Sequence, residues 1–360
     1  MTEFSVKINV GKGYEVRIGS SLLDDCGNII AKTTSLCRVA VITDSNVEKL
    51  YLDKVIKSLQ QAGFDTLSFS FPAGEESKNI STLSDILEFL AENNFSRTDM
   101  LIALGGGVTG DITGFAAAVY LRGIRYVQLP TTLLAAVDSS VGGKTAIDLK
   151  AGKNLAGAFK QPEIVLCDIS TFETLPETEF SNGIAESIKY GILFDKPLFD
   201  AFASSDLSSN RLTGDKLTDV IAKCVAHKGR IVELDEFDNG DRRLLNLGHT
   251  IGHAIEKCSS FKIQHGHAVA AGMAMIARAG EKKGLTKEGT ANEISQALAK
   301  YALPIDTDFD IDELNAVTLT DKKRAGKKIA LIVPEETGKC IIKTEPVEAL
   351  REYITLGKGV

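Results

Sequence analysis

The sequence predicts the α/β fold class, with a parallel-sheet domain in residues 1–173 followed by a mostly α-helical domain in residues 174–360. The first observation behind this prediction is that short apolar runs alternate with helix-length segments in the first half of the chain. The second is that helical periodicity dominates after about Thr174. The third is the length of 360 residues, which allows two domains that each bury a core.

The expected strands of the first domain are apolar runs rich in β-branched residues. They are Arg38–Thr43, Thr66–Phe71, Met100–Leu104, Tyr126–Pro130 and Ile164–Cys167. Helical segments, among them Asn46–Ala62 and Ile80–Asn93, separate these runs. Continuous apolar strands between helices are typical of a parallel sheet covered on both faces. Before them, Phe4–Val10 and Tyr14–Gly19 predict a hairpin.

The second domain is expected to consist of helices and one late hairpin. The helical patterns are Glu177–Leu193, Asp215–Glu236, His249–Lys257, Ala268–Lys283 and Glu288–Ala302, and the hairpin joins Lys328–Val333 to Cys340–Lys343. The helix that begins at Ala268 is apolar on all sides, which predicts that it is buried.

Composition and charge exclude several classes of function. The net charge of −7 argues against a nucleic-acid-binding or membrane-surface protein, because both need a basic face. No apolar stretch is long enough to span a bilayer, and the N-terminus lacks the features of a signal peptide. The six cysteines are scattered without a Cys-x-x-Cys pair, so we expect reduced thiols in a cytoplasmic protein.

A glycine-rich segment, Gly105–Asp111, follows an expected strand and opens an expected helix. It matches G-x-G-x-x-G, a pattern in which the backbone approaches a dinucleotide pyrophosphate at a helix N-terminus. The acidic residue expected about 20 positions later is missing, since no Asp or Glu lies between residues 112 and 137. Asp44, at the end of the first strand of this alternating unit, is a candidate ribose ligand. A tight strand–helix turn and a helix cap are the structural alternatives.

Basic side chains gather in glycine-bearing segments of this acidic chain. Gly142–Thr145 imitates the end of a Walker A loop, but the leading glycine of that motif is absent and the P-loop interpretation fails. Arg122, Lys144, Lys153 and Asn154 nevertheless indicate a local site for a phosphate or a carboxylate. Solvated surface lysines are the ordinary alternative.

Two helices carry charged residues that have more than one interpretation. Glu186 and Lys189 lie at i,i+3 spacing, for which a surface ion pair is the commoner explanation. Lys228 lies on the apolar stripe of its helix, between Cys224 and Val232, so its amine must snorkel to solvent or face a polar cleft.

Four of the five histidines fall between residues 249 and 267. His249 and His253 share one helix face at i,i+4 spacing. His265 and His267 precede the apolar helix, whose N-terminus disfavours imidazolium and keeps a histidine neutral. With a carboxylate in reach, a metal site explains this cluster better than four separate structural histidines.

Six longer segments carry motifs in a fixed order along the chain: Gly105–Asp111, Gln128–Leu134, Val137–Ala146, Gly152–Asn154, Asn182–Tyr190 and Leu244–His253. Together they resemble the 3-dehydroquinate synthase family, within the sugar phosphate cyclase superfamily, over nearly the whole chain. The resemblance implies that the first domain binds a dinucleotide and that the helical domain binds metal and substrate.

The resemblance also implies roles for individual residues. The metal, expected to be Zn²⁺ with Co²⁺ as the alternative, would be held by Glu186, His249 and His265. NAD would be contacted by Asp44, Asn46, Glu75, Lys78, Gly106, Gly107, Val108, Asp111, Thr131, Thr132, Lys144, Lys153, Thr171 and Thr174. Catalytic and substrate contacts are implied for Arg122, Asp138, Lys144, Asn154, Lys189, Lys228, Arg242, Asn246 and His253, and for Lys322 or Lys323.

The reaction that the resemblance implies is a carbon–oxygen lyase step of the shikimate pathway, which leads to chorismate and the aromatic amino acids. It converts 3-deoxy-D-arabino-heptulosonate 7-phosphate into 3-dehydroquinate and phosphate. NAD transiently oxidises a secondary alcohol, phosphate is eliminated, the hydride returns, and an aldol step closes the ring. The metal would lower the pKa of the substrate hydroxyl and His253 would move its proton. A homodimer is implied as well.

Two alternatives stay open, and one position departs from the family. A sister sugar phosphate cyclase would not need Lys228 and Arg242 to recognise a carboxylate, and a metal-dependent polyol dehydrogenase would release net NADH. The family commonly reads His-Gly-Glu where this chain has His265, Gly266 and His267. If the missing carboxylate orients a ligand, metal affinity or pH dependence changes, and His267 is a possible competing ligand.

Overall fold

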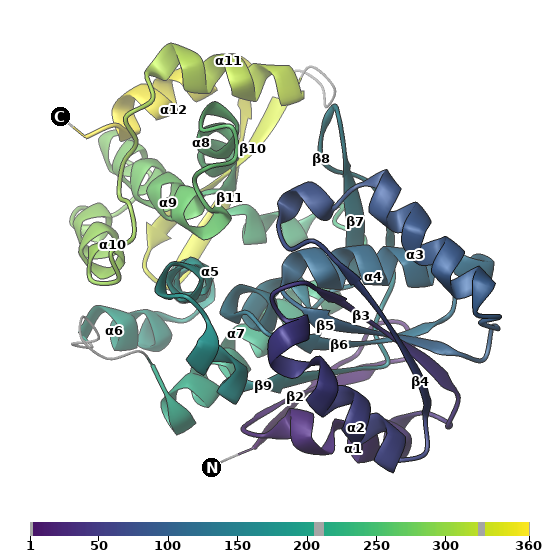
Figure 1. The fold of residues 1–360 in the computed structure, drawn as a ribbon. Coiled ribbons are helices and arrows are strands. Elements are labelled where there is room, and N and C mark those ends of the chain that lie inside the picture. Colours follow the sequence, from purple (N-terminus) through teal and green to yellow (C-terminus); the bar gives the residue numbers. More distant parts are fainter. Residues whose placement is uncertain (1–2, 205–211, 323–327, 360) are drawn as a thin grey trace. The chain divides into compact units, whose positions relative to one another are not determined.

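The computed structural model describes residues 3–204, 212–322 and 328–359. The chain divides into two compact units, both visible in Figure 1. The first, the sheet unit, comprises Met1–Pro176 and Thr213–Phe237. The second, the helical unit, comprises Glu177–Leu212 and Asp238–Val360.

A seven-stranded sheet forms the centre of the sheet unit. Its strand order is β1 (Phe4–Ile8), β2 (Tyr14–Gly19), β9 (Ile164–Asp168), β6 (Arg125–Pro130), β5 (Met100–Gly105), β3 (Arg38–Asp44) and β4 (Asp65–Phe71). The strands β1 and β2 pair antiparallel as a hairpin, whereas all pairs from β2 to β4 are parallel. The parallel sheet and the N-terminal hairpin predicted from the sequence are therefore confirmed.

Helices cover both faces of this sheet (Figure 1). They are α1 (Cys26–Thr33), α2 (Asp53–Gln61), α3 (Ile80–Glu92) and α4 (Gly107–Val119), with short helical turns η1 (Leu22–Asp25), η2 (Glu48–Leu52), η3 (Glu75–Ser77), η4 (Tyr120–Arg122), η5 (Ala135–Ser139) and η6 (Ile169–Thr174) between the longer elements. Along β3, Val39 and Val41 belong to the core shared with α1 and α2, whereas Ala40 and Ile42 belong to the core shared with α3 and α4. Successive side chains of a strand point to opposite faces, so one fully apolar strand serves two cores.

The hairpin of β7 (Lys144–Leu149) and β8 (Gly152–Phe159) packs against α4 and was not predicted. The segment carries glycines and charged residues instead of a continuous apolar run, so the pattern used to find the other strands is absent here.

Helix α7 (Gly214–Leu234) belongs to the sheet unit, although it follows part of the helical unit in the chain. It packs against β1, β2 and η5. The observed units therefore differ from the expected division after residue 173, because the first unit reaches Pro176 and also takes residues 213–237. Helical periodicity reports an apolar stripe but does not report which surface that stripe covers.

The helical unit contains α5 (Glu177–Phe194), α6 (Lys196–Ser204), η7 (Asp241–Asn246), α8 (His249–Cys258), α9 (His265–Lys282), α10 (Thr290–Ala299), α11 (Ile311–Lys322), the hairpin of β10 (Lys328–Glu336) and β11 (Lys339–Pro346), η8 (Val347–Ala349) and α12 (Leu350–Gly357). Helix α9 packs against α5, α8, α10 and α12, and every residue from Ala268 to Ala277 is buried, as predicted. The helix begins at His265, three residues earlier than the predicted start at Ala268. Among the described residues, no helix combines the length and apolarity needed to cross a membrane.

Two glycines allow α9 to lie unusually close to its neighbours. A Cβ atom on Gly266 would stand 2.1 Å from the backbone oxygen of Asn182 in α5. A Cβ atom on Gly272 would stand 2.1 Å from the backbone oxygen of Gly248, immediately before α8. Any side chain at either position would push the helices apart. This close packing brings the starts of α8 and α9 to the middle of α5.

Candidate functional site

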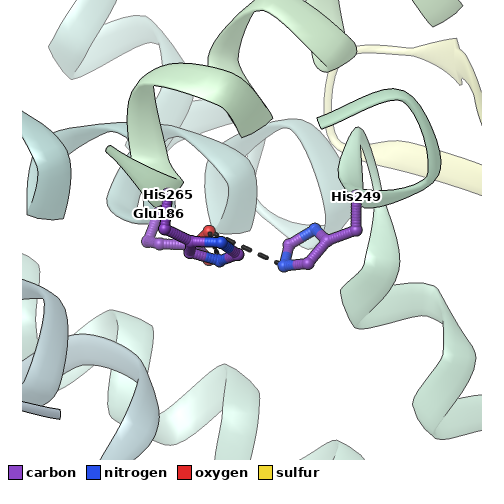
Figure 2. Close-up of side chains that lie close together, drawn as sticks. All are labelled: Glu186, His249 and His265. Carbon is purple, nitrogen blue, oxygen red and sulfur yellow. Dashed lines mark ion pairs between the residues drawn. The ribbon is translucent and has the colours of Figure 1, made fainter. Parts of the chain in front are cut away.

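Three side chains of the helical unit point toward one another: Glu186 from α5, His249 from α8 and His265 from α9 (Figure 2). The Nε2 atom of His249 lies 3.8 Å from Glu186 Oε1, and the Nε2 atom of His265 lies 3.7 Å from the same oxygen. One potential ligand atom of each residue lies within 4.8 Å of the other two. The fold thus brings together the three residues that the family resemblance implied as metal ligands.

This donor set fits a divalent metal such as Zn²⁺. Glu186 is 0% exposed, yet neither of its carboxylate oxygens accepts a hydrogen bond from any described residue. The two nitrogen–oxygen distances are too long for hydrogen bonds. They are close to the separation of about 3.4 Å between atoms that share a tetrahedral ion at about 2.1 Å. Two imidazoles and one carboxylate also form a ligand set of catalytic zinc sites with an open fourth position.

Both ligand histidines are held through their second ring nitrogen. The Nδ1 atom of His249 lies 3.0 Å from the backbone oxygen of Leu247, and the Nδ1 atom of His265 lies 3.2 Å from Glu256 Oε2. If Nδ1–H donates in each case, Nε2 keeps its lone pair directed toward Glu186.

Lys189 places a positive charge beside Glu186. Its Nζ forms an ion pair with Glu186 Oε2, and both side chains are buried. The i,i+3 ion pair considered from the sequence is therefore present, but it lies in the interior, because α6 and α9 pack against α5. Burial and the charge of Lys189 lower the pKa of His249 well below its usual value, which keeps this ring neutral and able to ligate.

The pKa values of the two histidines at the start of α9 are shifted in opposite directions. Burial opposes the charged form of His265, but the hydrogen bond and charge of Glu256, followed by the charge of Glu186, outweigh it and raise the pKa. Burial lowers the pKa of His267. The two pKa shifts follow from burial and from the neighbouring carboxylates, so the effect expected of the helix N-terminus stays a prediction.

His253 lies one turn after His249 on α8 and is exposed. Its ring centroid is 5.4 Å from that of His249 and 5.8 Å from that of His265. The histidine predicted to act in proton transfer is thus adjacent to both candidate ligand rings and open to solvent.

His267 occupies the position at which the chain departs from the family. Its Nε2 atom lies 2.9 Å from Ser181 Oγ. It belongs to neither group of side chains that could hold a metal within the described part of the chain. The suggestion that His267 competes as a metal ligand therefore finds no geometric support.

The carboxyl ends of three adjacent parallel strands bring several predicted cofactor residues to one edge of the sheet. Asp44 ends β3, Gly106 separates β5 from α4, and Thr131 follows β6. The Thr131 hydroxyl is buried and has no hydrogen-bond partner among the described residues. A glycine turn into a helix N-terminus, beside a carboxylate on the neighbouring strand, is the arrangement that binds dinucleotides in doubly wound sheets. These residues therefore fit NAD.

Asp44 shows that the structural alternative and the cofactor interpretation are compatible. One carboxylate oxygen, Oδ1, accepts backbone hydrogen bonds from Asn46 at 2.9 Å and Val47 at 3.2 Å, in the turn that precedes η2. The other, Oδ2, accepts a hydrogen bond of 3.3 Å from the Thr109 hydroxyl in the glycine-rich helix α4. These hydrogen bonds hold the carboxylate beside the glycine-rich helix.

A polar cluster around the buried Lys78 joins three segments of the sheet unit. The Lys78 Nζ lies 2.5 Å from Asp111 Oδ2, 2.6 Å from Asn154 Oδ1 and 3.9 Å from Glu75 Oε1. Lys153 Nζ lies 3.6 Å from Glu75 Oε1. Burial alone would lower the pKa of Lys78, but attraction to Asp111 and Glu75 raises it, so the amine stays charged. Five residues implied by the resemblance therefore form one polar network.

Lys228 is buried, at 6% exposure, and does not snorkel to solvent. Its Nζ donates hydrogen bonds to the backbone oxygen of Asp138 at 2.6 Å and to Asp138 Oδ1 at 2.9 Å. A lysine on an apolar stripe indeed reaches a polar partner, which is a second residue implied by the resemblance.

The other predicted residues are distributed over both units. In the sheet unit these are Asn46, Gly107, Val108, Arg122, Thr132, Lys144, Thr171 and Thr174; in the helical unit they are Arg242 and Asn246. Arg122 is exposed and has a φ of 70°. Arg242 is buried, and Asn246 ends η7, three residues before His249. Lys322 ends α11, whereas Lys323 lies outside the described residues.

Two carboxylates in these networks were missed by the sequence analysis. Asp148 Oδ1 accepts the backbone N–H of Asn154 at 2.7 Å, in a turn where Asn154 has a φ of 54°. Glu256 bonds His265 and follows His253 by three residues on α8. The His249, His253 and Glu256 spacing of four and three residues puts all three on one helix face, and this signal was available in the sequence.

Comparison with known proteins places the fold in a defined class. A structure of 2-deoxy-scyllo-inosose synthase complexed with carbaglucose-6-phosphate, NAD⁺ and Co²⁺ matches with a TM-score of 0.87 and 25% identity, over 98% of this chain and 99% of that one. The 2-epi-5-epi-valiolone synthase ValA from Streptomyces hygroscopicus, solved with NAD⁺ and Zn²⁺, matches with a TM-score of 0.87 and 24% identity, over 98% of this chain. The fold is that of the sugar phosphate cyclases.

The sequence comparisons resolve the family within that class. Residues 68–182 match the 3-dehydroquinate synthase N-terminal family, and residues 183–324 match the 3-dehydroquinate synthase C-terminal family. The 3-dehydroquinate synthase of Clostridium acetobutylicum is 43% identical over 94% of this chain and 95% of its own length. That of Streptococcus sanguinis is 40% identical over 97% and 99%. The chain belongs to the 3-dehydroquinate synthase family.

Proposed function

We propose that the chain is a lyase that converts 3-deoxy-D-arabino-heptulosonate 7-phosphate into 3-dehydroquinate and phosphate, with NAD and a divalent metal as cofactors. The observation that carries this proposal is the buried Glu186, which faces the Nε2 atoms of His249 and His265 and accepts no hydrogen bond from the described residues. A family member with this donor set has the parts that the family reaction requires.

The metal ligands are Glu186, His249 and His265, and NAD is held along the edge of the sheet marked by Asp44 and Thr131. The cofactors supply reversible oxidation of a substrate alcohol and acidification of a substrate hydroxyl. The contribution of the chain is to hold their ligands in place before substrate binds. The buried Glu186 and the neutral His249 support this role.

His253 exchanges the proton of the reacting substrate hydroxyl. Its ring is adjacent to both ligand histidines, and it is exposed, so it can receive a proton from a bound substrate and pass it to solvent. His249 and His265 direct Nε2 toward Glu186 and are not available for this step.

The cations Lys189, Lys228 and Arg242 bind the anionic groups of the substrate, together with Arg122, Lys144, Lys153 and Asn154 of the sheet unit. Lys189, Lys228 and Arg242 are buried, and the family resemblance assigns them this role. Asp138 holds the amine of Lys228 through two hydrogen bonds, which fixes its position before substrate arrives. Asn246, at the end of η7 and three residues before His249, is a further substrate contact in this proposal.

The test is to incubate purified protein with NAD, Zn²⁺ and the heptulosonate phosphate while following phosphate release and NADH absorbance. We expect one phosphate per substrate consumed without accumulation of NADH, because the hydride is returned within each turnover. Steady accumulation of NADH would show a net dehydrogenase instead. Phosphate release from hexose phosphate, but not from the heptulosonate, would show a sister cyclase.

We further propose that the enzyme works as a cytoplasmic homodimer. The scattered cysteines, all free within the described residues, agree with a reducing compartment. Light scattering of the purified protein should give twice the mass of one chain, and a monomer of full activity would contradict the dimer.

A further inference from the structure

Glu256 is a buried carboxylate that the family assignment leaves without a role. It lies near the C-terminus of α8, and its side chain is 4% exposed. Its Oε2 atom lies 3.2 Å from Nδ1 of His265 and forms a hydrogen bond with that ring. A carboxylate kept out of water needs a partner that compensates its charge, and this imidazole is one.

The hydrogen bond determines which nitrogen of His265 can bind a metal. A carboxylate only accepts hydrogen bonds, so the proton of a neutral imidazole belongs on Nδ1. The other nitrogen, Nε2, then carries the lone pair, and this is the atom that lies 3.7 Å from Glu186 Oε1. His249 has the same arrangement, except that a neutral backbone oxygen of Leu247 takes the place of the carboxylate.

We infer that Glu256 is a positioning residue that fixes the tautomer and ring orientation of His265 for metal binding. The inference rests on the proposed metal site. A carboxylate that accepts the N–H of a ligand histidine also makes the ligating nitrogen a stronger donor. Loss of such a partner weakens metal binding by about 10–100-fold in known sites.

Position 267, where the family commonly has a carboxylate, does not fill this role. His267 bonds Ser181 through Nε2 and makes no described contact with His265. A carboxylate is therefore supplied to His265 from α8, by a residue three positions after His253, and not from its own helix.

The experiment measures Zn²⁺ affinity by competition with a chromophoric chelator for four full-length proteins. These are the unmodified chain, Glu256→Met, Glu256→Gln and His267→Gln. Methionine nearly matches glutamate in volume and length but has no strong acceptor, so it removes the hydrogen bond without opening a cavity. Glutamine keeps an oxygen acceptor and removes only the charge.

We expect Glu256→Met to bind Zn²⁺ about 10–100-fold more weakly, with Glu256→Gln between it and the unmodified protein. His267→Gln is the control, because His267 lies in the same turn of α9 as His265. This variant should bind Zn²⁺ as tightly as the unmodified chain does. Wild-type affinity in Glu256→Met overturns the inference. If that variant does not fold when its thermal unfolding is followed in chelator, Glu256→Leu, which also lacks an acceptor, takes its place, and wild-type affinity in Glu256→Leu overturns the inference.

A second readout separates positioning from a general structural role. In the zinc-loaded protein labelled with ¹⁵N-histidine, His265 should show a protonated Nδ1 and a metal-bound Nε2. In Glu256→Met the Nδ1 proton should exchange with water much faster. Metal bound through Nδ1 overturns the inference, because His253, Glu256 and His265 would then be the actual ligands of a different site.

Failure of this inference can be distinguished from failure of the proposed metal site. If the unmodified protein binds Zn²⁺ and His249→Ala does not, while Glu256→Met binds normally, only the role of Glu256 is wrong. If His249→Ala binds Zn²⁺ as tightly as the unmodified protein, the ligand set itself is wrong.

Discussion

Buried charged side chains have different kinds of partner in the two units. In the sheet unit, the buried amines of Lys78 and Lys228 each have carboxylate or carbonyl oxygens within hydrogen-bonding distance. In the helical unit, Glu186 is fully buried and faces Lys189 and two histidine rings, but it accepts no hydrogen bond from a described residue. A buried charged group with hydrogen-bond partners stays fixed in position. A buried carboxylate that accepts no hydrogen bond is stabilised by a bound cation. The contrast supports the metal site proposed in the helical unit.

The largest expected effect comes from removing one of the ligands. His249→Ala should weaken Zn²⁺ binding by more than about 100-fold, since even outer partners of metal ligands contribute 10–100-fold. Turnover should fall to background, while NAD binding to the sheet unit should persist. Metal content by atomic absorption and NAD binding by calorimetry measure both effects. Equal loss of NAD binding would show that the variant is misfolded or that the two sites are not separate.

The second prediction compares Lys189→Met with Lys78→Met, one from each unit. Each substitution leaves a buried carboxylate without its cation and should lower the free energy of unfolding by about 3–5 kcal/mol in chelator. Adding Zn²⁺ should restore part of this loss in Lys189→Met, because the metal compensates Glu186. In Lys78→Met, Zn²⁺ should raise the free energy of unfolding only as much as it does in the unmodified protein, because binding to the native state stabilises both. Denaturant unfolding with and without Zn²⁺ provides the measurement, and equal responses would remove the contrast between the units.

The third prediction concerns the buried thiol of Cys26 in the core of the sheet unit. Burial raises the pKa of the Cys26 thiol to about 11, while an unfolded thiol titrates near 9.0. The unfolded state therefore loses its proton first, so the stability contributed is complete below pH 9 and declines as the pH rises toward 11. Between pH 7 and pH 10 this amounts to about 1.4 kcal/mol.

Cys26→Ala should lose less stability over the same pH range, whatever its stability at pH 7. Urea unfolding at pH 7, 9 and 10 compares the two slopes. Parallel pH dependence in both proteins would mean that the thiol ionises equally easily in the folded and unfolded chain.

The smallest effect concerns the two roles of Asp44. Asp44→Ala removes the side-chain hydrogen bonds to Asn46 and Val47 and should reduce the free energy of unfolding by about 1 kcal/mol, whereas Asp44→Asn keeps the accepting oxygen and should be nearly neutral. Both variants should bind NAD more weakly, because the proposed ribose contact uses the carboxylate. NAD affinity unchanged in Asp44→Asn would leave Asp44 with these hydrogen bonds alone.

Helices and strands with a clear pattern of apolar residues could be predicted from the sequence. Elements whose burial depends on packing against distant segments could not. The strands β3 and β5 were found because they are apolar on both faces, and β7 and β8 were missed because they lack such a run. At the site, Glu186 and Lys189 looked like surface residues by spacing, and only the family resemblance gave them a role. Their burial depends on α6 and α9, which no local pattern of α5 reports.

For the three candidate metal ligands, too, the sequence predicted one part and not another. The histidine cluster was evident in the sequence, but the partner of each Nδ1 atom was not. Leu247 contributes a backbone oxygen, which has no signature in a sequence. Glu256 lies at a spacing that the sequence does display, but its importance emerges only when α9 brings His265 against α8.

The route of the chain has a consequence for any attempt to divide this protein. Helix α7 packs against β1 and β2 of the sheet unit, although the segments before and after it belong to the helical unit. The chain therefore passes from one unit to the other three times, after Pro176, Leu212 and Phe237. A fragment that stops at Pro176 would expose the apolar surface that α7 covers and would lack Lys228. The remaining fragment would carry that helix with nothing to pack against. Gene truncation after Pro176 should therefore yield two pieces that aggregate, and a separately folding sheet unit would need residues 213–237 attached to it.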